Sequence, residues 1–182
     1  MMEWCVYVNK LDPSFELPSY GTSFSSCFDL KFQAKLDEEI MAVSSANRSY
    51  PIRIESGSNP SVPHRIYLGP GDRALIPTGL IFKIEATKSH QSYSIRLHPR
   101  SSVAYKRGLM LANCEGVIDI DYQEQVYVPI VNISTTIQAI ELGERICQGE
   151  LVENKIVKFL EVPQRLKKYS ERSGGFGSTG RM

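Results

Sequence analysis

The chain is made of short runs in which apolar and polar residues alternate, and Gly, Pro, Asn and Ser separate these runs. In the run from Tyr93 to His98, Tyr, Ile and Leu fall on one side and Ser, Arg and His on the other. Successive side chains of a β-strand point to opposite faces, so the pattern gives a strand one buried and one exposed face. Helical periodicity is nearly absent. The sequence therefore predicts an all-β fold.

Turn residues set the limits of the other expected strands. The residues from Pro77 to Gly79 divide the run 73–84 into two strands. Two more strands are expected at 125–132 and 145–152, and turns at 69–72 and 141–144.

One short helix is expected at Val103 to Arg107, with Ser101 or Ser102 as its N-cap and Gly108 at its end. Arg100 directly precedes the two serines. A guanidinium and two hydroxyls at the start of a helix can bind an anion. An ordinary serine cap explains the same residues more simply.

The length of 182 residues and the hydrophobic content of 42% predict one domain with a core. We expect this domain to span residues 1–162 and a C-terminal arm with a glycine-rich end to span 163–182. The segment 35–63 is richer in Ser, Asn and Pro and has a weaker pattern. It is expected to be a surface insertion between strands.

Charge and composition argue against several classes of protein. The formal net charge is +1, so nothing favours bulk attraction to nucleic acid. No apolar run is long enough for a membrane span, and the first residues do not resemble a signal peptide. The four cysteines form no Cys-x-x-Cys pair, which favours reduced thiols. We therefore expect a cytoplasmic protein, or a nuclear one in a eukaryotic or viral host, that is not secreted.

The C-terminal segment from Arg172 to Gly180 places one aromatic ring, Phe176, among four glycines, with Ser178 and Thr179 beyond it. A base can stack on the ring, and guanidinium, hydroxyl and backbone amide groups bind phosphates. The segment therefore suggests a flexible strap over a nucleotide. A plain linker is the alternative, since glycine-rich ends are common.

The second polar cluster runs from Asn113 to Tyr122. Asn113 and Gly116 flank what we expect to be the tight end of a hairpin. On the strand that follows, Asp119 and Asp121 are expected to share one face. Two carboxylates on one face suit a general base or a metal site, and an acidic solvated edge is the alternative.

Taken in order, five segments of the chain resemble the motifs of the trimeric deoxyuridine triphosphatases (dUTPases). The resemblance extends from Ser26 to Gly180 and rests on these segments: 26–30, 99–102, 113–122, 143–148 and 172–180. It implies a jelly-roll-like β-barrel of the dUTPase or β-clip type, with one short helix and a C-terminal arm. It also implies hydrolysis of dUTP to dUMP and pyrophosphate, which limits uracil in DNA and supplies dUMP for dTMP synthesis.

The resemblance further implies a role for each matching residue. Asp119 would orient and deprotonate the water that attacks the α-phosphate, and Tyr122 would pack against the deoxyribose. Contacts with the uracil edge fall to the turn residues Asn113, Gly116, Val117 and Ile118. Contacts with the phosphates or the attacking water fall to Arg100, Ser101, Ser102 and Gln148. In the tail, Phe176 and Gly177 would cover the base, and the outer phosphates would be bound by Arg172, Ser178 and Thr179.

A magnesium ion is the implied cofactor, with Asp29 near it through a water molecule. The implied assembly is a homotrimer whose sites take residues from all three chains, with dUTP as ligand and with no nucleic acid or membrane partner.

Two other functions stay open from the sequence. A dCTP deaminase has the same fold but needs a glutamate base soon after the 113–122 segment, and Glu124 lies too early. A nucleotide-gated regulatory protein would bind its partner through the segment 35–63.

Overall fold

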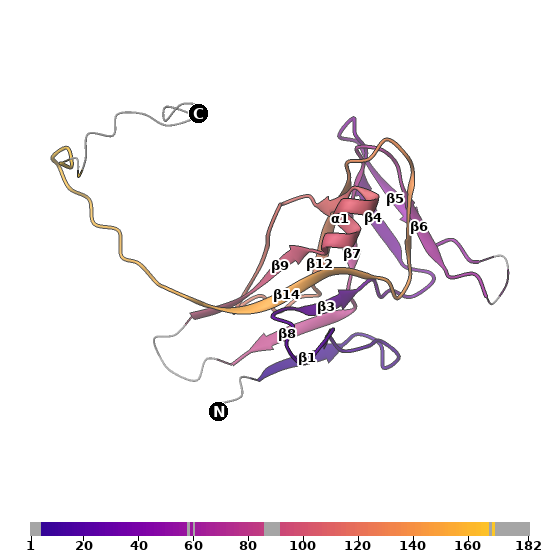
Figure 1. Cartoon of the computed structure of the whole chain (residues 1–182), viewed down its shortest axis with the longest axis horizontal. Coiled ribbons are helices and arrows are strands. Elements are labelled where there is room, and N and C mark those ends of the chain that lie inside the picture. The colour runs from indigo at the N-terminus through magenta and orange to yellow at the C-terminus, as the bar shows by residue number, and fades with distance from the viewer. Residues whose placement is uncertain (1–4, 58, 60, 86–91, 168, 170–182) are drawn as a thin grey trace.

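The computed structural model describes residues 5–57, 59, 61–85, 92–167 and 169. Its elements, in chain order, are β1 (Val6–Lys10), β2 (Ser19–Tyr20), β3 (Phe28–Lys31), β4 (Glu39–Val43), β5 (Ser49–Arg53), β6 (Arg65–Leu68), β7 (Arg73–Pro77), β8 (Leu80–Ile84), β9 (Ser92–Pro99), α1 (Ser101–Arg107), β10 (Leu109–Leu111), β11 (Gly116–Asp119), β12 (Tyr127–Asn132), β13 (Gln138–Glu141) and β14 (Arg145–Asn154). The expectation of an all-β chain with one short helix is confirmed (Figure 1).

The described strands form two five-stranded antiparallel sheets and two ribbons of two strands each. One sheet has the order β10-β12-β7-β4-β5, and the other has the order β11-β9-β14-β3-β2. The ribbons pair β1 with β8 and β13 with β6. This arrangement is consistent with the expected jelly roll, although the described ladders do not close into one continuous barrel.

Turns repeatedly send the chain from one sheet to another. The two strands expected within 73–84 are β7 and β8, and they are joined at Gly79, whose φ of 68° favours glycine. They do not pair with each other, because β7 joins a five-stranded sheet while β8 pairs with β1. Neighbours in sequence therefore lie on different ladders, and both ladders contribute to one core.

The core lies between the sheets and is filled by the inward faces of their strands. Ile95 and Leu97 of β9 and Ile76 of β7 are almost fully buried, as the alternating pattern requires. Burying one such side chain contributes about 1.5–3 kcal/mol. Ser94, on the opposite face of β9, is also buried, so this face is covered as well.

The segment 35–63 was expected to be a surface insertion. The structure shows that it also contains a hairpin, which belongs to the five-stranded sheet of β7. Strands β4 and β5 pair with each other, and β4 also pairs with β7. Ile40, Ala42 and Ile52 of the hairpin are buried in the core. Only alternate residues point inward, but the outward residue between Ile40 and Ala42 is the apolar Met41, so the sequence shows no alternation there. In β5 the outward Pro51 interrupts the pattern.

The helix forms where it was expected, but the serine cap is wrong. Arg100 is the N-cap residue, with φ −80° and ψ 130°, and no side chain caps the helix. Gly108 ends the helix in the left-handed conformation, as predicted. The hydroxyls of Ser101 and Ser102 make no hydrogen bond with another described residue, so both are free for other partners.

After β14 the chain leaves the body as an extended segment, here called the arm and counted from residue 155 (Figure 1). The described part of the arm exposes large apolar side chains, namely Ile156, Val157, Phe159, Leu160, Val162 and Leu166. No helix in the described part of the chain is long and apolar enough to span a membrane.

Gly149 on β14 gives a test of the packing between the sheets. A Cβ atom at this position would lie 2.8 Å from Cε2 of Phe28, whose ring packs edge-on against Phe82. We expect Gly149→Ala to destabilise the protein by about 1–3 kcal/mol, because the core is overpacked. Urea unfolding measures this loss. Gly21→Ala is the control, since its Cβ would lie 3.6 Å from the nearest atom, Oγ of Ser25. Equal stability of the two variants would contradict the packing.

Candidate functional site

A polar pocket lies where β3, β14 and β9 end side by side. Strand β14 runs between β3 and β9, so Gln148 is opposite Asp29 on one side and His98 on the other. The pocket has a volume of about 370 Å³ and is lined by Gly21, Ser25, Ser26, Cys27, Asp29, Arg100, Ser101, Ser102, Arg145 and Gln148. The structure thus brings together phosphate-binding candidates from two sequence segments and the metal candidate Asp29 from a third.

Asp29 holds two arginines at this pocket. Its Oδ1 atom lies 2.8 Å from Nε of Arg100, and its Oδ2 atom lies 3.1 Å from Nη1 of Arg145. The Asp29 side chain is only 12% exposed, so little water screens these ion pairs. Arg100 also donates a hydrogen bond to the carbonyl oxygen of Arg145, at 3.3 Å. Both guanidinium groups therefore have fixed orientations, and the trio carries one net positive charge.

Arg145 is a pocket residue that the sequence did not single out. It belongs to the segment 143–148, in which only Gln148 was selected as a candidate. Its link to Asp29 spans 116 positions, so it depends on the β14–β3 ladder. The signal available in the sequence was a basic residue at the start of a strand that directly follows a turn.

The hydroxyls of Ser101 and Ser102 add uncharged hydrogen-bond donors beside the arginines. Gln148 donates from Nε2 to the carbonyl oxygen of Pro99, at 3.1 Å, and this bond fixes its side chain at the pocket wall. Fixed cations with nearby hydroxyls form a site for a phosphate or pyrophosphate group.

Direct binding of magnesium by Asp29 does not fit these residues, because both carboxylate oxygens already accept bonds from arginines. No group of three or more His, Cys, Asp and Glu side chains that could hold a metal occurs among the described residues. Each oxygen keeps a further lone pair, which could accept a hydrogen bond from a metal-bound water. The water-mediated contact expected from the sequence therefore fits.

Two cysteines near the pocket are protonated at neutral pH. Burial raises the pKa of the Cys147 thiol to about 12, and Asp29 adds to this effect. Burial also raises the pKa of Cys27, which lines the pocket, with contributions from Glu150 and Asp29. A thiol is nucleophilic only as the thiolate, so neither cysteine is activated for covalent catalysis.

The segment from Asn113 to Gly116 was expected to be the tight end of a hairpin, but the strands on either side of it do not pair with each other. Strand β10 before it pairs with β12, whereas β11 after it pairs with β9. The turn thus links the two five-stranded sheets. A Cβ atom on Gly116 would lie 3.0 Å from Cβ of Leu97, which explains the glycine at the start of β11. The remaining strand residues alternate, with Val117 exposed and Ile118 buried.

Asp119 and Asp121 do not share the face of one strand. Strand β11 ends at Asp119, and a turn follows, closed by a bond from the Tyr122 amide to the Asp119 carbonyl oxygen at 3.1 Å. The side chain of Asp119 is exposed and pairs with no other described residue. Of these two carboxylates, Asp119 lies on the paired strand and is the better candidate for a general base.

Tyr122 follows this turn, and its hydroxyl group is neutral. Its OH group donates to the carbonyl oxygen of Gln125, at 2.9 Å. Burial raises the pKa of Tyr122, with smaller contributions from Glu124 and Tyr127. The phenol is therefore protonated at neutral pH, and its ring is exposed and can pack against a ligand.

Within one chain the candidate residues fall into two separate groups. None of the candidates from 113–122 lines the pocket that contains Arg100 and Gln148. Asn113 instead lines another hollow, of about 500 Å³, beside β7 and β4. The tail candidates, Arg172, Phe176, Gly177, Ser178 and Thr179, lie outside the described residues.

A dUTPase family model matches residues 55–180, which is more than half of the chain. The deoxyuridine 5'-triphosphate nucleotidohydrolase of Chlamydia muridarum is 31% identical over 171 residues, covering 94% of this chain and 95% of that protein. The protein of the same name from Finegoldia magna is 40% identical over 115 residues, covering 63% of this chain and 76% of that protein.

Among solved structures, a variant of the phage 80alpha dUTPase aligns with a TM-score of 0.68 at 19% identity, covering 97% of this chain and 99% of that chain. This likeness shows that the fold is shared.

Asp29→Asn tests whether the carboxylate acts by orienting the arginines. Removing a negative charge from an anion site should by itself strengthen anion binding. We expect the opposite, a roughly 3- to 10-fold weaker binding of pyrophosphate, because both guanidinium groups lose their shared partner. Calorimetry at fixed salt concentration gives the affinity. Tighter binding by the variant would show that net charge outweighs orientation.

Proposed function

The chain belongs to the dUTPase family, and we propose that it hydrolyses dUTP to dUMP and pyrophosphate. This activity would limit uracil in DNA and supply dUMP for dTMP synthesis. The observation that best supports it is the pair of arginines held on Asp29 beside two free serine hydroxyls. Phosphoryl transfer needs positioned positive charge more than covalent help, and this pocket offers such charge.

We assign the phosphates to this pocket and the chemistry to a water molecule held by Asp119. The Asp119 carboxylate would accept a proton from this water as its oxygen bonds to the α-phosphorus. The bond from that phosphorus to the bridging oxygen then breaks, and pyrophosphate leaves. A positioned base of this kind contributes about 10²- to 10⁴-fold in rate. Asp119 is exposed and without a partner among the described residues, which leaves its lone pairs free for the proton.

The base would be recognised at the turn 113–116 and the strand after it. The backbone of Gly116, Val117 and Ile118 and the amide of Asn113 are proposed to read the uracil edge. Tyr122 would pack against the deoxyribose and exclude a 2′-hydroxyl. The tail, with Phe176 and Gly177 over the base and with Arg172, Ser178 and Thr179 on the phosphates, is proposed to cover the bound nucleotide.

Magnesium is the proposed cofactor. When bound to the triphosphate it would neutralise charge on the phosphate oxygens. Asp29 would approach it only through a metal-bound water, and the protein would otherwise bind the phosphates by Arg100, Arg145 and the serines.

We also propose that the active assembly is a homotrimer in which each site takes residues from several chains. None of the candidates from 113–122 lines the pocket of Arg100 and Gln148 in one chain, which supports a site completed by another chain. The arm is a second support, since its apolar side chains are exposed on a lone chain, with Phe159 90% exposed.

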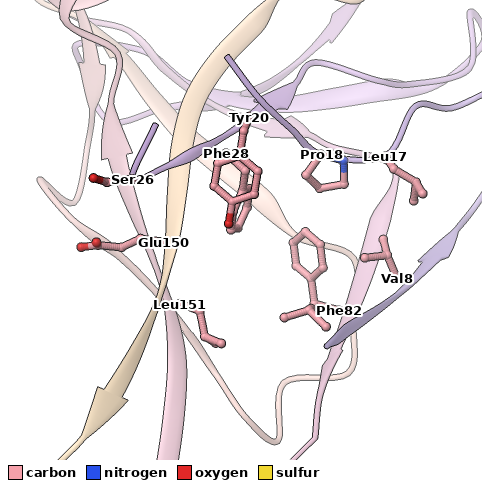
Figure 2. Close-up of a pocket in the computed structure, with 10 residues that line it drawn as sticks. Val8, Leu17, Pro18, Tyr20, Ser26, Phe28, Phe82, Glu150 and Leu151 are labelled. Atoms are coloured by element: carbon pink, nitrogen blue, oxygen red, sulfur yellow. The ribbon is translucent and has the colours of Figure 1, made fainter. Parts of the chain in front are cut away.

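A groove beside β1 is a suitable place for the arm of another copy. This N-terminal groove has a volume of about 570 Å³ and an apolar lining that includes Val8, Leu17, Phe28 and Phe82 (Figure 2). Its one carboxylate, Glu150, is opposite in charge to Lys155 and Lys158 of the arm.

A cytoplasmic location and the domain limits 1–162 and 163–182 stay predictions.

The activity is tested with purified protein, Mg²⁺ and the four nucleotides dUTP, dCTP, dTTP and UTP. Pyrophosphate release should be far faster from dUTP than from the others. Asp119→Asn should reduce turnover by at least 100-fold while the affinity for a non-hydrolysable dUTP analogue changes little. Equal rates for all four nucleotides would refute the proposed function, and ammonia release from dCTP would favour a deaminase. Unchanged turnover of Asp119→Asn would remove Asp119 from the mechanism.

The assembly is tested by a charge placed on either side of the proposed contact. Phe159→Glu in the arm and Leu17→Glu in the groove should each lower the average mass measured by light scattering, because a buried unpaired charge weakens the interface. Both side chains are exposed in the lone chain, so neither change should prevent folding. Ile137→Glu, an exposed apolar position before β13, is the control. A trimer mass that survives both changes would exclude this groove as the docking place.

A further inference from the structure

The turn 113–116 lacks the cross-strand ladder that normally fixes a tight turn. Its flanking strands belong to different sheets, so no ladder joins them across the turn. At one end the Ala112 amide bonds to the Pro129 carbonyl oxygen at 2.7 Å, and at the other Gly116 pairs with Leu97. Between these ends the backbone has a local turn bond, from the Cys114 amide to the Leu111 carbonyl oxygen at 3.1 Å, and this bond does not fix the position of the tip relative to β9.

This stretch of backbone is also unfavourable by itself. Cys114 has a φ of 64°, in the left-handed region that residues with a Cβ atom rarely adopt. The next amide, of Glu115, bonds back to the Asn113 carbonyl oxygen at 2.7 Å, which makes the turn very tight. Such a backbone persists only where the surroundings hold it.

The side chain of Glu115 supplies a tether from the tip of the turn to β9. Its Oε2 atom lies 3.3 Å from Nη1 of Arg96, and its Oε1 atom lies 4.0 Å from Nδ1 of His98. Arg96 and His98 point to the same face of β9, two positions apart. One carboxylate thus reaches two side chains on one face of β9, the strand that pairs with β11.

Both partners of Glu115 are themselves held by β14. Arg96 donates from Nη2 to Oδ1 of Asn154 at 3.3 Å, and Nε2 of His98 lies 3.2 Å from Oε1 of Glu150. The side chains of Arg96 and His98 are less than one-third exposed. A network with fixed, partly covered members orders its end group better than a lone surface ion pair.

We propose that Glu115 is a positioning residue for nucleotide binding, which acts by holding the turn that carries Asn113 in its binding conformation. This inference rests on the proposed function, because it concerns the base-reading turn of that site. Glu115 itself need not touch the nucleotide. Asp119 lies at the far end of β11, where the ladder pairs it with Ser94, so the chemical step does not depend on the tether.

Glu115→Gln tests the proposal, since it removes the charge and keeps the shape of the side chain. We expect KM for dUTP to rise about 3- to 10-fold and kcat to stay within about twofold, because ordering the turn becomes part of binding. Arg96→Met should have a similar effect, and the double variant should be little worse than either single one. Glu39→Gln is the matched control, since it breaks a surface ion pair with Arg53 in the β4–β5 hairpin.

A second readout is independent of catalysis. Without nucleotide, the amides of 113–116 should exchange with deuterium faster in Glu115→Gln than in the unchanged protein, while the melting temperature stays nearly constant. An unchanged KM together with unchanged exchange would overturn the proposal. A fall in kcat at constant KM would also overturn it, by assigning Glu115 to the chemistry. Lack of dUTP hydrolysis by the unchanged protein would instead refute the proposed function, and the exchange experiment would still test the tether.

Discussion

The antiparallel ladder between β9 and β14 is the constraint on which the other parts of the molecule depend. It pairs eight residues of each strand, from Cys147 opposite Pro99 to Asn154 opposite Ser92. At one end it places Gln148 beside the arginine pocket, and at the other end it directs the arm away from the body. In its middle, the outer face carries Arg96 and His98. If either strand shifted by one residue, the side chains of that strand would turn to the opposite face of the sheet.

The ladder between β14 and β3 explains why a carboxylate can be retained inside a pocket for anions. Asp29, on β3, lies opposite Gln148 of β14 and bonds to both Arg100 and Arg145. Two guanidinium groups side by side repel each other and would turn apart into water. The carboxylate between them reduces that repulsion and leaves one net positive charge. The stabilisation of the fold is modest, since desolvation offsets much of the attraction in such pairs. The main gain is a fixed geometry.

Much of the fold was predictable from the residues because burial obeys a local rule. The alternation in the run 93–98 correctly places Ile95 and Leu97 in the core. Gly108 was correct as the helix end because only a residue without Cβ adopts that conformation easily. The β4–β5 hairpin was missed, since the outward Met41 and Pro51 remove the apolar–polar alternation that marks a strand.

The errors at the site have a different cause. Pairing between strands is set by the whole fold, and a hairpin expected at 113–116 cannot be distinguished locally from a link between two sheets. Asp121 was placed with Asp119 because alternation was assumed to continue past the end of β11. Arg145 was overlooked because its partner lies 116 positions away. Residue types thus pointed to the right chemistry, while the partners of each group came only from three dimensions.

Under the proposed function a turn between two sheets recognises the base, and the loose attachment of this turn suits the task. A hairpin ladder would fix the turn rigidly to one sheet, whereas here each end follows a different sheet. The tip can then be set by the ion pair of Glu115 with Arg96 of β9, and the energy of such a pair is comparable with the thermal energy. Glu115 therefore biases the turn toward one conformation without locking it. Under the proposed function, such a balance would keep the backbone open to a nucleotide that enters and leaves in every turnover, while Asp119, paired with Ser94, would stay fixed for the chemical step.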